Sequence, residues 1–248
     1  MNTQFRVVIP ARLESTRLPR KPLADIAGKP MVVHVAERAH ASGAEEVWIA
    51  TDSPEIEHAA HANGIAVRLT STDHMSGSDR VAQLVHELGW GAEILVVNVQ
   101  GDEPLIAPLL IRQVATQLES HPAAAMATAC HAISEPSEIE NPNIVKVVCD
   151  AAGYASYFSR AAIPFARDTR APKSAFRHIG IYAYRVEFLK QFTQLPAAPT
   201  ERYEALEQLR ALWHGYKISV AISEAEPAPG VDTEADLQRV RALFASSR

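Results

Sequence analysis

The chain has 248 residues and a formal net charge of −5, and 47% of its residues are hydrophobic. This hydrophobic fraction is enough for a sizeable buried core, and the net negative charge argues against nucleic acid as a general partner. Cys130 and Cys149 are too few for a disulfide framework, and no run approaches the roughly 18 apolar residues of a membrane span. We therefore expect a soluble protein of a reducing compartment, with two free buried thiols.

The first half of the chain alternates strand-like apolar runs with amphipathic segments. In chain order, the pattern predicts a strand at 5–9, a helix at 31–41, a strand at 47–50, a helix at 54–62, a strand at 66–69, a helix at 79–88, a strand at 94–99, a helix at 108–119 and a strand at 125–129. Ser76 or Ser78 is expected to cap the helix at 79–88. The alternation predicts an α/β fold with a doubly wound, mostly parallel sheet.

After about residue 130 the rhythm changes. Strands at 143–149 and 155–159 flank Asp150-Ala-Ala-Gly153, which is typical of a hairpin turn. A strand is expected at 178–184, a helix at 200–214 with Leu206, Leu209, Leu212 and Trp213 on its apolar side, a strand at 217–222 and a helix at 233–244. We interpret the hairpin-rich region as an insertion or lid on a single domain spanning residues 1–248.

Four cations follow the first strand within one loop: Arg12, Arg17, Arg20 and Lys21. Ligands of open α/β sheets bind outside the carboxyl ends of the strands, which is where this loop lies. Four prolines restrict its backbone and would order the cations in advance. Arginine forks and a lysine ammonium suit a polyphosphate, although a solvated basic turn is the alternative. No P-loop or G-x-G-x-x-G motif is present.

Two aspartates also stand where the sheet is expected to bind ligands. Asp102 directly follows the apolar strand at 94–99, after Gly101, which would let a ligand approach the backbone closely. Asp232 precedes the last helix, where an N-cap is the alternative role. Together with the cationic loop, the pair predicts a magnesium–polyphosphate site, since Mg²⁺ prefers one or two carboxylates plus phosphates and water.

Several longer blocks resemble one enzyme family in the expected order along nearly the whole chain. They are IPARLESTRLPRKPL, HMSGSDR, NVQGDEPLI, NPNIVKVV, YFSRAAIPF, RHIGIYAYR, LEQLRALW and GVDTEADL. This set resembles the CMP-KDO synthetases, or 3-deoxy-manno-octulosonate cytidylyltransferases. One departure is Arg20, which stands where the family usually has glycine, in STRLPGKPL.

The resemblance implies a nucleotide-diphospho-sugar-transferase-like fold and a nucleotidyltransferase activity: CMP passes from CTP to 3-deoxy-D-manno-octulosonate (KDO), pyrophosphate is released, and the product serves lipopolysaccharide biosynthesis. It also implies a cytoplasmic, Mg²⁺-dependent homodimer. Residues of about 1–130 and 217–248 would bind the nucleotide, and residues of about 131–216 would bind the sugar and form the dimer.

The same resemblance implies roles for individual residues. Nucleotide-binding residues would be Ala11, Arg12, Arg17, Lys21, Ser76, Gly77, Ser78 and Arg80. Asp102 and Asp232 would hold the metal and, with Arg12 and Lys21, form the catalytic group. KDO would be bound by Gln100, Arg160, His178, Tyr182, Glu207 and Gln208. On chemistry alone, Glu207 and Gln208 are solvated residues on the polar face of the helix at 200–214, and His178 is a structural histidine.

Two other functions remain open at this stage. The fold could carry a non-catalytic nucleotide-binding module, because fold does not fix function. The enzyme could also act on a related acidic sugar, such as an 8-amino derivative of KDO, because a single substituent changes few contacts.

Overall fold

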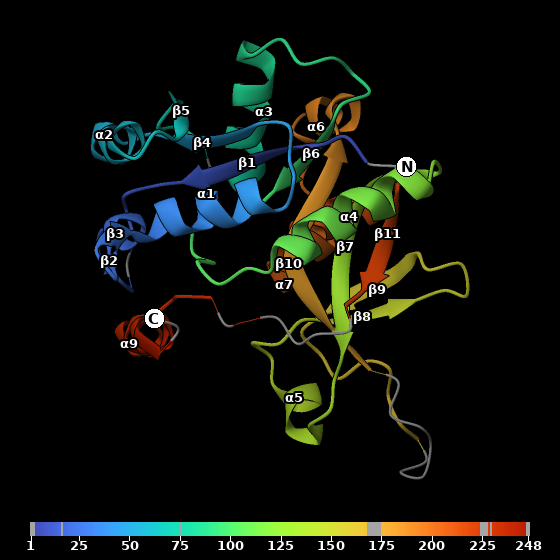
Figure 1. Cartoon of the computed structure of the whole chain (residues 1–248). Coiled ribbons are helices and arrows are strands. Elements are labelled where there is room, and N and C mark those ends of the chain that lie inside the picture. Colours follow the sequence, from blue (N-terminus) through green and yellow to red (C-terminus); the bar gives the residue numbers. More distant parts are fainter. Residues whose placement is uncertain are drawn as a thin grey trace.

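The centre of the protein is a large twisted sheet (Figure 1). The computed structural model describes residues 3–15, 17–74, 76–167, 175–223, 228 and 230–246. Within these residues a nine-stranded sheet has the main order β11-β7-β10-β6-β1-β4-β5. Its strands are β1 (Arg6–Ala11), β4 (Val47–Thr51), β5 (Ala66–Leu69), β6 (Leu95–Asn98), β7 (Ala124–Ala132), β8 (Lys146–Cys149), β9 (Ala155–Ser159), β10 (Phe176–Arg185) and β11 (Lys217–Ile222).

The sheet is mostly parallel, as predicted. Strands β5, β4, β1 and β6 run parallel to one another, and β11 runs parallel to β7. Strand β10 lies antiparallel between β6 and β7. The predicted hairpin is formed by β8 and β9, which extend the sheet from one end of β10. In its turn, Asp150 Oδ1 accepts hydrogen bonds of 2.9 Å from the backbone N–H groups of Ala152 and Tyr154.

Helices cover both faces of the sheet, which confirms the doubly wound arrangement. One core contains side chains of α1 (Met31–Ala41), α2 (Pro54–Ala62) and α4 (Pro108–Ser120). The other contains side chains of α3 (Gly77–Glu87), α6 (Val186–Phe192) and α8 (Leu209–Trp213). Because successive strand residues point to opposite faces, Val7 and Ile9 of β1 enter the first core while Val8 enters the second.

The C-terminal helix α9 (Glu234–Ser246) returns to the loop that follows β1. Figure 1 shows it beside the short hairpin β2 (Asp25–Ile26)–β3 (Lys29–Pro30) and away from β11. Leu237 and Val240 of α9 share a buried cluster with Ile26. Arg241 Nε donates a 2.9 Å hydrogen bond to the carbonyl of Asp25. This packing carries the start of α9 to the cationic loop.

One predicted helix is wrong. The segment 200–214 forms two short helices, α7 (Pro199–Glu204) and α8, separated at Ala205, whose φ is 52°. On one continuous helix, Leu206 and Gln208 would lie about 200° apart around the axis and could not both face one core. The break lets both be buried, with Gln208 only 3% exposed. Gln208 is therefore not a solvated residue of a polar face, and Trp213, predicted on the apolar side, is 57% exposed.

The sequence also misses four short elements: the 3-10 helix η1 (Lys21–Leu23), the β2–β3 hairpin, α5 (Pro136–Glu140) and α6. Both cysteines are free thiols, as predicted. Cys130 is buried, also as predicted, and Cys149 is half-buried. Burial raises the pKa of Cys130 to about 12 and that of Cys149 to about 11, so both stay protonated at neutral pH. Among the described residues, no helix combines the length and apolar character needed to cross a membrane.

Candidate active site

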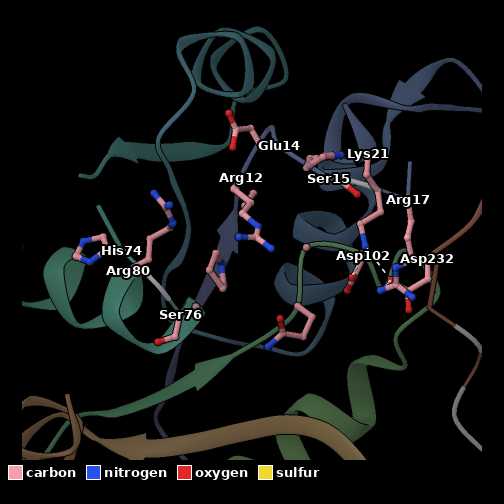
Figure 2. Close-up of a pocket in the computed structure, with 16 residues that line it drawn as sticks. Arg12, Glu14, Ser15, Arg17, Lys21, His74, Ser76, Arg80, Asp102 and Asp232 are labelled. Atoms are coloured by element: carbon pink, nitrogen blue, oxygen red, sulfur yellow. Dashed lines mark hydrogen bonds and ion pairs between the residues drawn. The ribbon is translucent and has the colours of Figure 1, made fainter. Parts of the chain in front are cut away.

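A cleft of about 340 Å³ opens at the carboxyl ends of β1 and β6 (Figure 2). Its lining brings together many of the predicted nucleotide and metal residues, namely Ala11, Arg12, Arg17, Lys21, Ser76, Gly77, Arg80, Asp102 and Asp232. Gln100, predicted for the sugar, also lines it. In Figure 2, Arg12 lies between Ser76 and Arg80 on one side and Lys21, Asp102 and Asp232 on the other. The cleft therefore has a cation–carboxylate end and a helix-terminus end.

Two glycines pack the walls of the cleft onto the end of β1. A Cβ atom at Gly101 would lie 3.0 Å from the carbonyl oxygen of Pro10, and one at Gly77 would lie 3.3 Å from Pro10 Cγ. The close backbone approach at Gly101 is thus made by β1, where the sequence led us to expect a ligand. Glycine at these positions lets the loop after β6 and the start of α3 both reach the β1 loop.

Lys21 bridges the two aspartates (Figure 2). Its Nζ lies 2.6 Å from Asp102 Oδ2 and 3.2 Å from Asp232 Oδ1. Arg17 Nη2 donates a second hydrogen bond, of 2.8 Å, to Asp232 Oδ1. The Lys21 side chain is only 15% exposed, so its ion pairs are shielded more than those at the open surface. Two carboxylates more than a hundred positions apart in the chain thus converge on one ammonium group.

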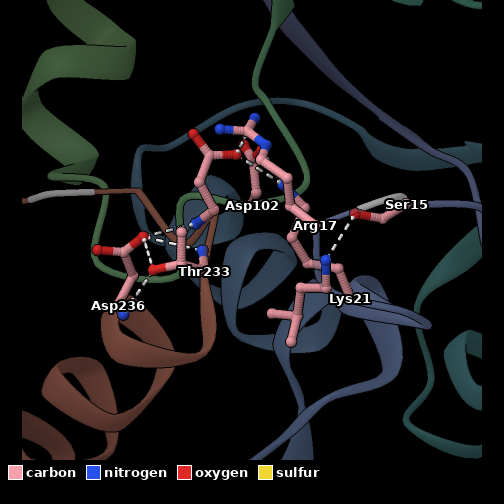
Figure 3. Close-up of polar contacts among 8 residues, drawn as sticks. Ser15, Arg17, Lys21, Asp102, Thr233 and Asp236 are labelled. Atoms are coloured by element: carbon pink, nitrogen blue, oxygen red, sulfur yellow. Dashed lines mark hydrogen bonds and ion pairs between the residues drawn. The ribbon is translucent and has the colours of Figure 1, made fainter.

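Asp232 does not cap α9. That task falls to Thr233, whose Oγ1 accepts from the backbone N–H of Asp236, and to Asp236, whose Oδ2 accepts from the N–H groups of Asp232 and Thr233. The hydrogen bond from the Thr233 hydroxyl is the main cause that lowers the pKa of Asp236 to about 2. Figure 3 shows Thr233 and Asp236 paired at the start of α9. The N-cap alternative is therefore wrong for Asp232, which lines the cleft.

The two carboxylates fit a divalent cation. Asp102 Oδ2 and Asp232 Oδ1 already contact one cationic atom, Lys21 Nζ. Across the described part of the chain, no group of three or more histidine, cysteine, aspartate or glutamate side chains could hold a metal ion. A metal bound here would take two carboxylates and fill its other positions with phosphate and water, which is how Mg²⁺ binds at nucleotide sites.

A further carboxyl group lies beside this pair. Burial, and then the charge of Asp102, raises the pKa of Glu103 to about 7. Glu103 therefore carries a full negative charge only above neutral pH, and below it the two aspartates dominate the negative potential of this end.

Arg20 points away from the cleft. Its Nη1 donates a 3.1 Å hydrogen bond to Glu55 Oε1 of α2, and Nη2 pairs with the other carboxylate oxygen. Arg20 also has a φ of 58°, in the left-handed region that favours glycine, at the residue preceding η1. The family's glycine is thus explained by this backbone conformation, and the arginine side chain serves a surface ion pair.

We expect Arg20→Gly to leave the KM for CTP and the turnover number unchanged, because the exposed Arg20–Glu55 pair contributes little and glycine suits the backbone. Steady-state kinetics with CTP as the varied substrate checks this. Glu55→Gln, which removes the same pair from the other side, is the matched control. A clear rise in the KM for CTP in Arg20→Gly alone would instead give Arg20 a phosphate contact.

The opposite end of the cleft is the N-terminus of α3. Ser76 Oγ accepts from the N–H of Asp79 and Asp79 Oδ2 accepts from the N–H of Ser76, each at 3.2 Å, so Ser76 is the cap and the helix begins at Gly77. Arg80 is 4% exposed, and its Nη2 pairs with Asp52 Oδ2 at 2.6 Å. This ion pair anchors the start of α3 to the end of β4.

Ser78 lies outside the lining of the cleft. It is 2% exposed, and its hydroxyl donates a 2.9 Å hydrogen bond to Glu207 Oε2 in the segment between α7 and α8. Burial is the main cause that raises the pKa of Glu207. The Ser78–Glu207 bond connects the start of α3 to the residues predicted to bind the sugar.

Apart from Gln100, the predicted sugar residues lie on β10, directly after β9 and in the α7–α8 connection. His178 and Tyr182 of β10 have ring centroids 5.5 Å apart, and the edge of His178 meets Phe158 at 4.9 Å. Arg160, directly after β9, donates from Nε to the carbonyl of Glu204 at 2.8 Å and from Nη1 to the carbonyl of Pro142 at 3.0 Å. These two hydrogen bonds hold the Arg160 guanidinium group in one orientation.

Burial lowers the pKa of His178 to about 3. The ordinary value is about 6.5, so the folded protein prefers the neutral ring. The His178 contribution to the free energy of unfolding is therefore complete above pH 6.5 and is lost as the pH falls from 6.5 towards 3.

We expect the free energy of unfolding to fall across this window with a slope of at most about 1.4 kcal/mol per pH unit from this one group. Denaturant unfolding from pH 7 to pH 4, comparing wild type with His178→Gln, measures it. Replacing the exposed His40 by glutamine is the matched control. Equal pH slopes for wild type and His178→Gln would contradict the burial of a neutral imidazole.

Three residues that line the cleft were not singled out from the sequence: Glu14, Ser15 and His74. All three lie inside the blocks that carry the family resemblance, next to residues that were chosen. Position within those blocks was the one signal that could have found them.

Comparison with known proteins identifies the family of this chain. A family model described as cytidylyltransferase matches residues 6–218. A 3-deoxy-manno-octulosonate cytidylyltransferase from Acidovorax sp. (strain JS42) is 57% identical, over 97% of each chain. A structure of CMP:2-keto-3-deoxy-manno-octonic acid synthetase complexed with CTP is 43% identical, covers 99% of this chain and 100% of its own, and has a TM-score of 0.93.

A more distant structure shares the fold alone. A cytidylyltransferase from Leptospira borgpetersenii is 18% identical, has a TM-score of 0.64, and aligns with 98% of this chain and 87% of its own. The family model ends before Asp232, whereas the two close relatives align over nearly the whole chain. The chain belongs to the cytidylyltransferase family and, within it, to the 3-deoxy-manno-octulosonate cytidylyltransferases, or CMP-KDO synthetases.

Proposed function

We infer that this protein transfers CMP from CTP to KDO, giving CMP-KDO and pyrophosphate for lipopolysaccharide biosynthesis. The observation that carries the inference is the convergence of Asp102, Asp232 and Lys21 at one end of a cleft, in a chain 57% identical to a named KDO cytidylyltransferase. The similar structure complexed with CTP, at 43% identity, supports CTP as the nucleotide.

The two ends of the cleft suggest how CTP lies in it. Arg12, Arg17 and Lys21 would hold the triphosphate, and the Ser76–Gly77 turn would meet the cytosine (Figure 2). The anomeric hydroxyl oxygen of KDO attacks the α-phosphorus and loses its proton to water. The bond from that phosphorus to the bridging oxygen breaks, and pyrophosphate leaves with the electron pair. Such phosphoryl chemistry depends mainly on positioning and on neutralising charge.

We propose that Asp102 and Asp232 hold Mg²⁺. When bound, the ion would neutralise phosphate charge and lower the pKa of the attacking hydroxyl, so no histidine base is required. Lys21 pairs with the same two carboxylates. Its flexible stem allows the ammonium to leave them for a phosphate oxygen once the carboxylates have another partner.

Two orphaned polar atoms support a sugar pocket at the α7–α8 connection. Glu207 Oε1 and Gln208 Nε2 are buried and, among the described residues, have no hydrogen-bond partner. Buried polar groups are rarely left unpaired, so a ligand that supplies hydroxyl groups would complete them. A polyol acid such as KDO offers those hydroxyls, and Arg160 offers a cation for its carboxylate.

The substrate is tested with a panel of acidic sugars. Turnover with CTP is measured for KDO, an 8-amino derivative of KDO and a sialic acid. We expect the highest kcat/KM with KDO. A higher value with the 8-amino derivative would change the sugar assignment, and CTP binding without turnover on any sugar would indicate a nucleotide-binding module.

We also propose that the enzyme is a cytoplasmic homodimer. Two aromatic side chains of the region 131–216 support an interface there, since Phe165 is 85% exposed and Tyr203 is 93% exposed. Exposed aromatic residues are enriched at protein interfaces. Light scattering should give twice the chain mass, and a monomer at micromolar concentration would reject the dimer. The cytoplasmic location stays a prediction of the resemblance.

A further inference from the structure

Strand β10 contains an irregularity between the two rings predicted to bind the sugar. Ile179 pairs with Ala129 of β7, but the next paired residue is Tyr182, opposite Thr128, so Gly180 and Ile181 are extra. His178 and Tyr182 therefore lie opposite residues that are only two positions apart on β7. Four residues of regular strand span about 13 Å, yet these ring centroids are 5.5 Å apart. The bulge brings the two rings together.

The side chain of Thr128 holds this bulge. Its Oγ1 lies 3.1 Å from the carbonyl oxygen of Ile179, the last paired residue before the bulge, and 2.8 Å from that of Ile181, the second extra residue. Thr128 is fully buried, with 0% exposure. No water competes for the hydroxyl there, so these contacts fix the path of the bulged backbone.

The same hydroxyl sets the tautomer of His178. Oγ1 also lies 2.9 Å from His178 Nε2. A hydroxyl has one proton, and carbonyl oxygens can only accept, so the proton of Thr128 is directed to the carbonyls. Towards His178 the hydroxyl must then accept, which places a proton on Nε2. In the neutral ring, Nδ1 is left with its lone pair as an acceptor.

We propose that Thr128 is a positioning residue for sugar binding: its hydroxyl pins the β10 bulge and keeps the His178 proton on Nε2, so that Nδ1 accepts a hydrogen bond from a sugar hydroxyl. This rests on the proposed function for the identity of the sugar. The sequence gives no hint of it, because Thr128 stands in the apolar run of β7 and contacts residues about fifty positions away.

Thr128→Val keeps the shape of the side chain and removes the hydroxyl, while Thr128→Ser keeps the hydroxyl. We expect Thr128→Val to raise the KM for KDO by about tenfold, the effect of one lost hydrogen bond, with the KM for CTP unchanged. Thr128→Ser should restore the KM for KDO. Thr51→Val, at another fully buried threonine, is the control for the general effect of this change on stability.

Nitrogen-15 NMR of the histidine rings gives a readout that does not depend on the reaction. We expect His178 to carry its proton on Nε2 in wild type and in Thr128→Ser, and to show a mixture of tautomers in Thr128→Val. A proton on Nδ1 in wild type would overturn the proposal even if Thr128→Val failed to fold, and so would an unchanged KM for KDO in a folded Thr128→Val. If wild type did not use KDO at all, the proposed function would fall, and the NMR comparison would still decide the role of Thr128.

Discussion

Asp102→Asn and Asp232→Asn are each expected to lower turnover by about a hundred- to a thousandfold while the protein stays folded. Both side chains are partly exposed, at 33% and 48%, and both face the cleft, so they contribute little to core packing. Asparagine keeps the shape of the side chain but removes the negative charge that would bind a cation between Asp102 and Asp232. The fall should therefore appear in the chemical step, with circular dichroism and melting temperature close to wild type.

Steady-state turnover at saturating CTP, KDO and magnesium measures this effect. Asp150→Asn, in the β8–β9 turn, is a suitable control because it makes the same chemical change at an exposed residue that does not line the cleft. Near-normal turnover of both cleft variants would rule out the two-carboxylate site.

The second large effect is expected at Lys21. The Lys21 ammonium pairs with both aspartates, and its side chain is mostly buried. The Arg17 side chain is 65% exposed and pairs with Asp232 but not with Asp102. An interaction that strengthens as charge develops on the leaving pyrophosphate raises turnover, and one that is equal in substrate and transition state alters only binding. We expect Lys21→Ala to lower turnover by about a hundredfold and Arg17→Ala to raise the KM for CTP by about tenfold.

These variants are compared at saturating magnesium, since removing the Lys21 ammonium leaves the two carboxylates unpaired and changes their demand for a cation. Lys29→Ala, at an exposed lysine paired with Glu37, is the control for loss of a surface charge. Unchanged turnover in Lys21→Ala would refute a role for this lysine in the transition state.

Elements with strong local signals could be predicted from the sequence. The helix Met31–Ala41 and the strand Lys217–Ile222 have the predicted bounds, because apolar periodicity and turn residues both mark them. The break at Ala205 could not be predicted, since the segment reads as a good helix. It arises because burying both Leu206 and Gln208 requires the helix to end.

The composition of the site was predicted better than its contacts. Strand-end position indicated Asp102, but its meeting with Asp232 depends on α9 packing against the β2–β3 hairpin, which no local pattern reveals. The proximity of His178 and Tyr182 depends on a bulge fixed by Thr128 from a neighbouring strand. Contacts of this kind are set by tertiary packing, so only the family resemblance indicated His178 and Tyr182 in advance, and nothing in the sequence indicated Thr128.

The most direct test of the whole account is the release of pyrophosphate from CTP by the purified protein with magnesium, with and without KDO. We predict rapid release only when KDO is present, one CMP-KDO formed for each pyrophosphate, and almost none of either product with Asp102→Asn. Release at the same rate without KDO, or no release with both substrates at saturation, would contradict the assignment of this cleft to CMP transfer.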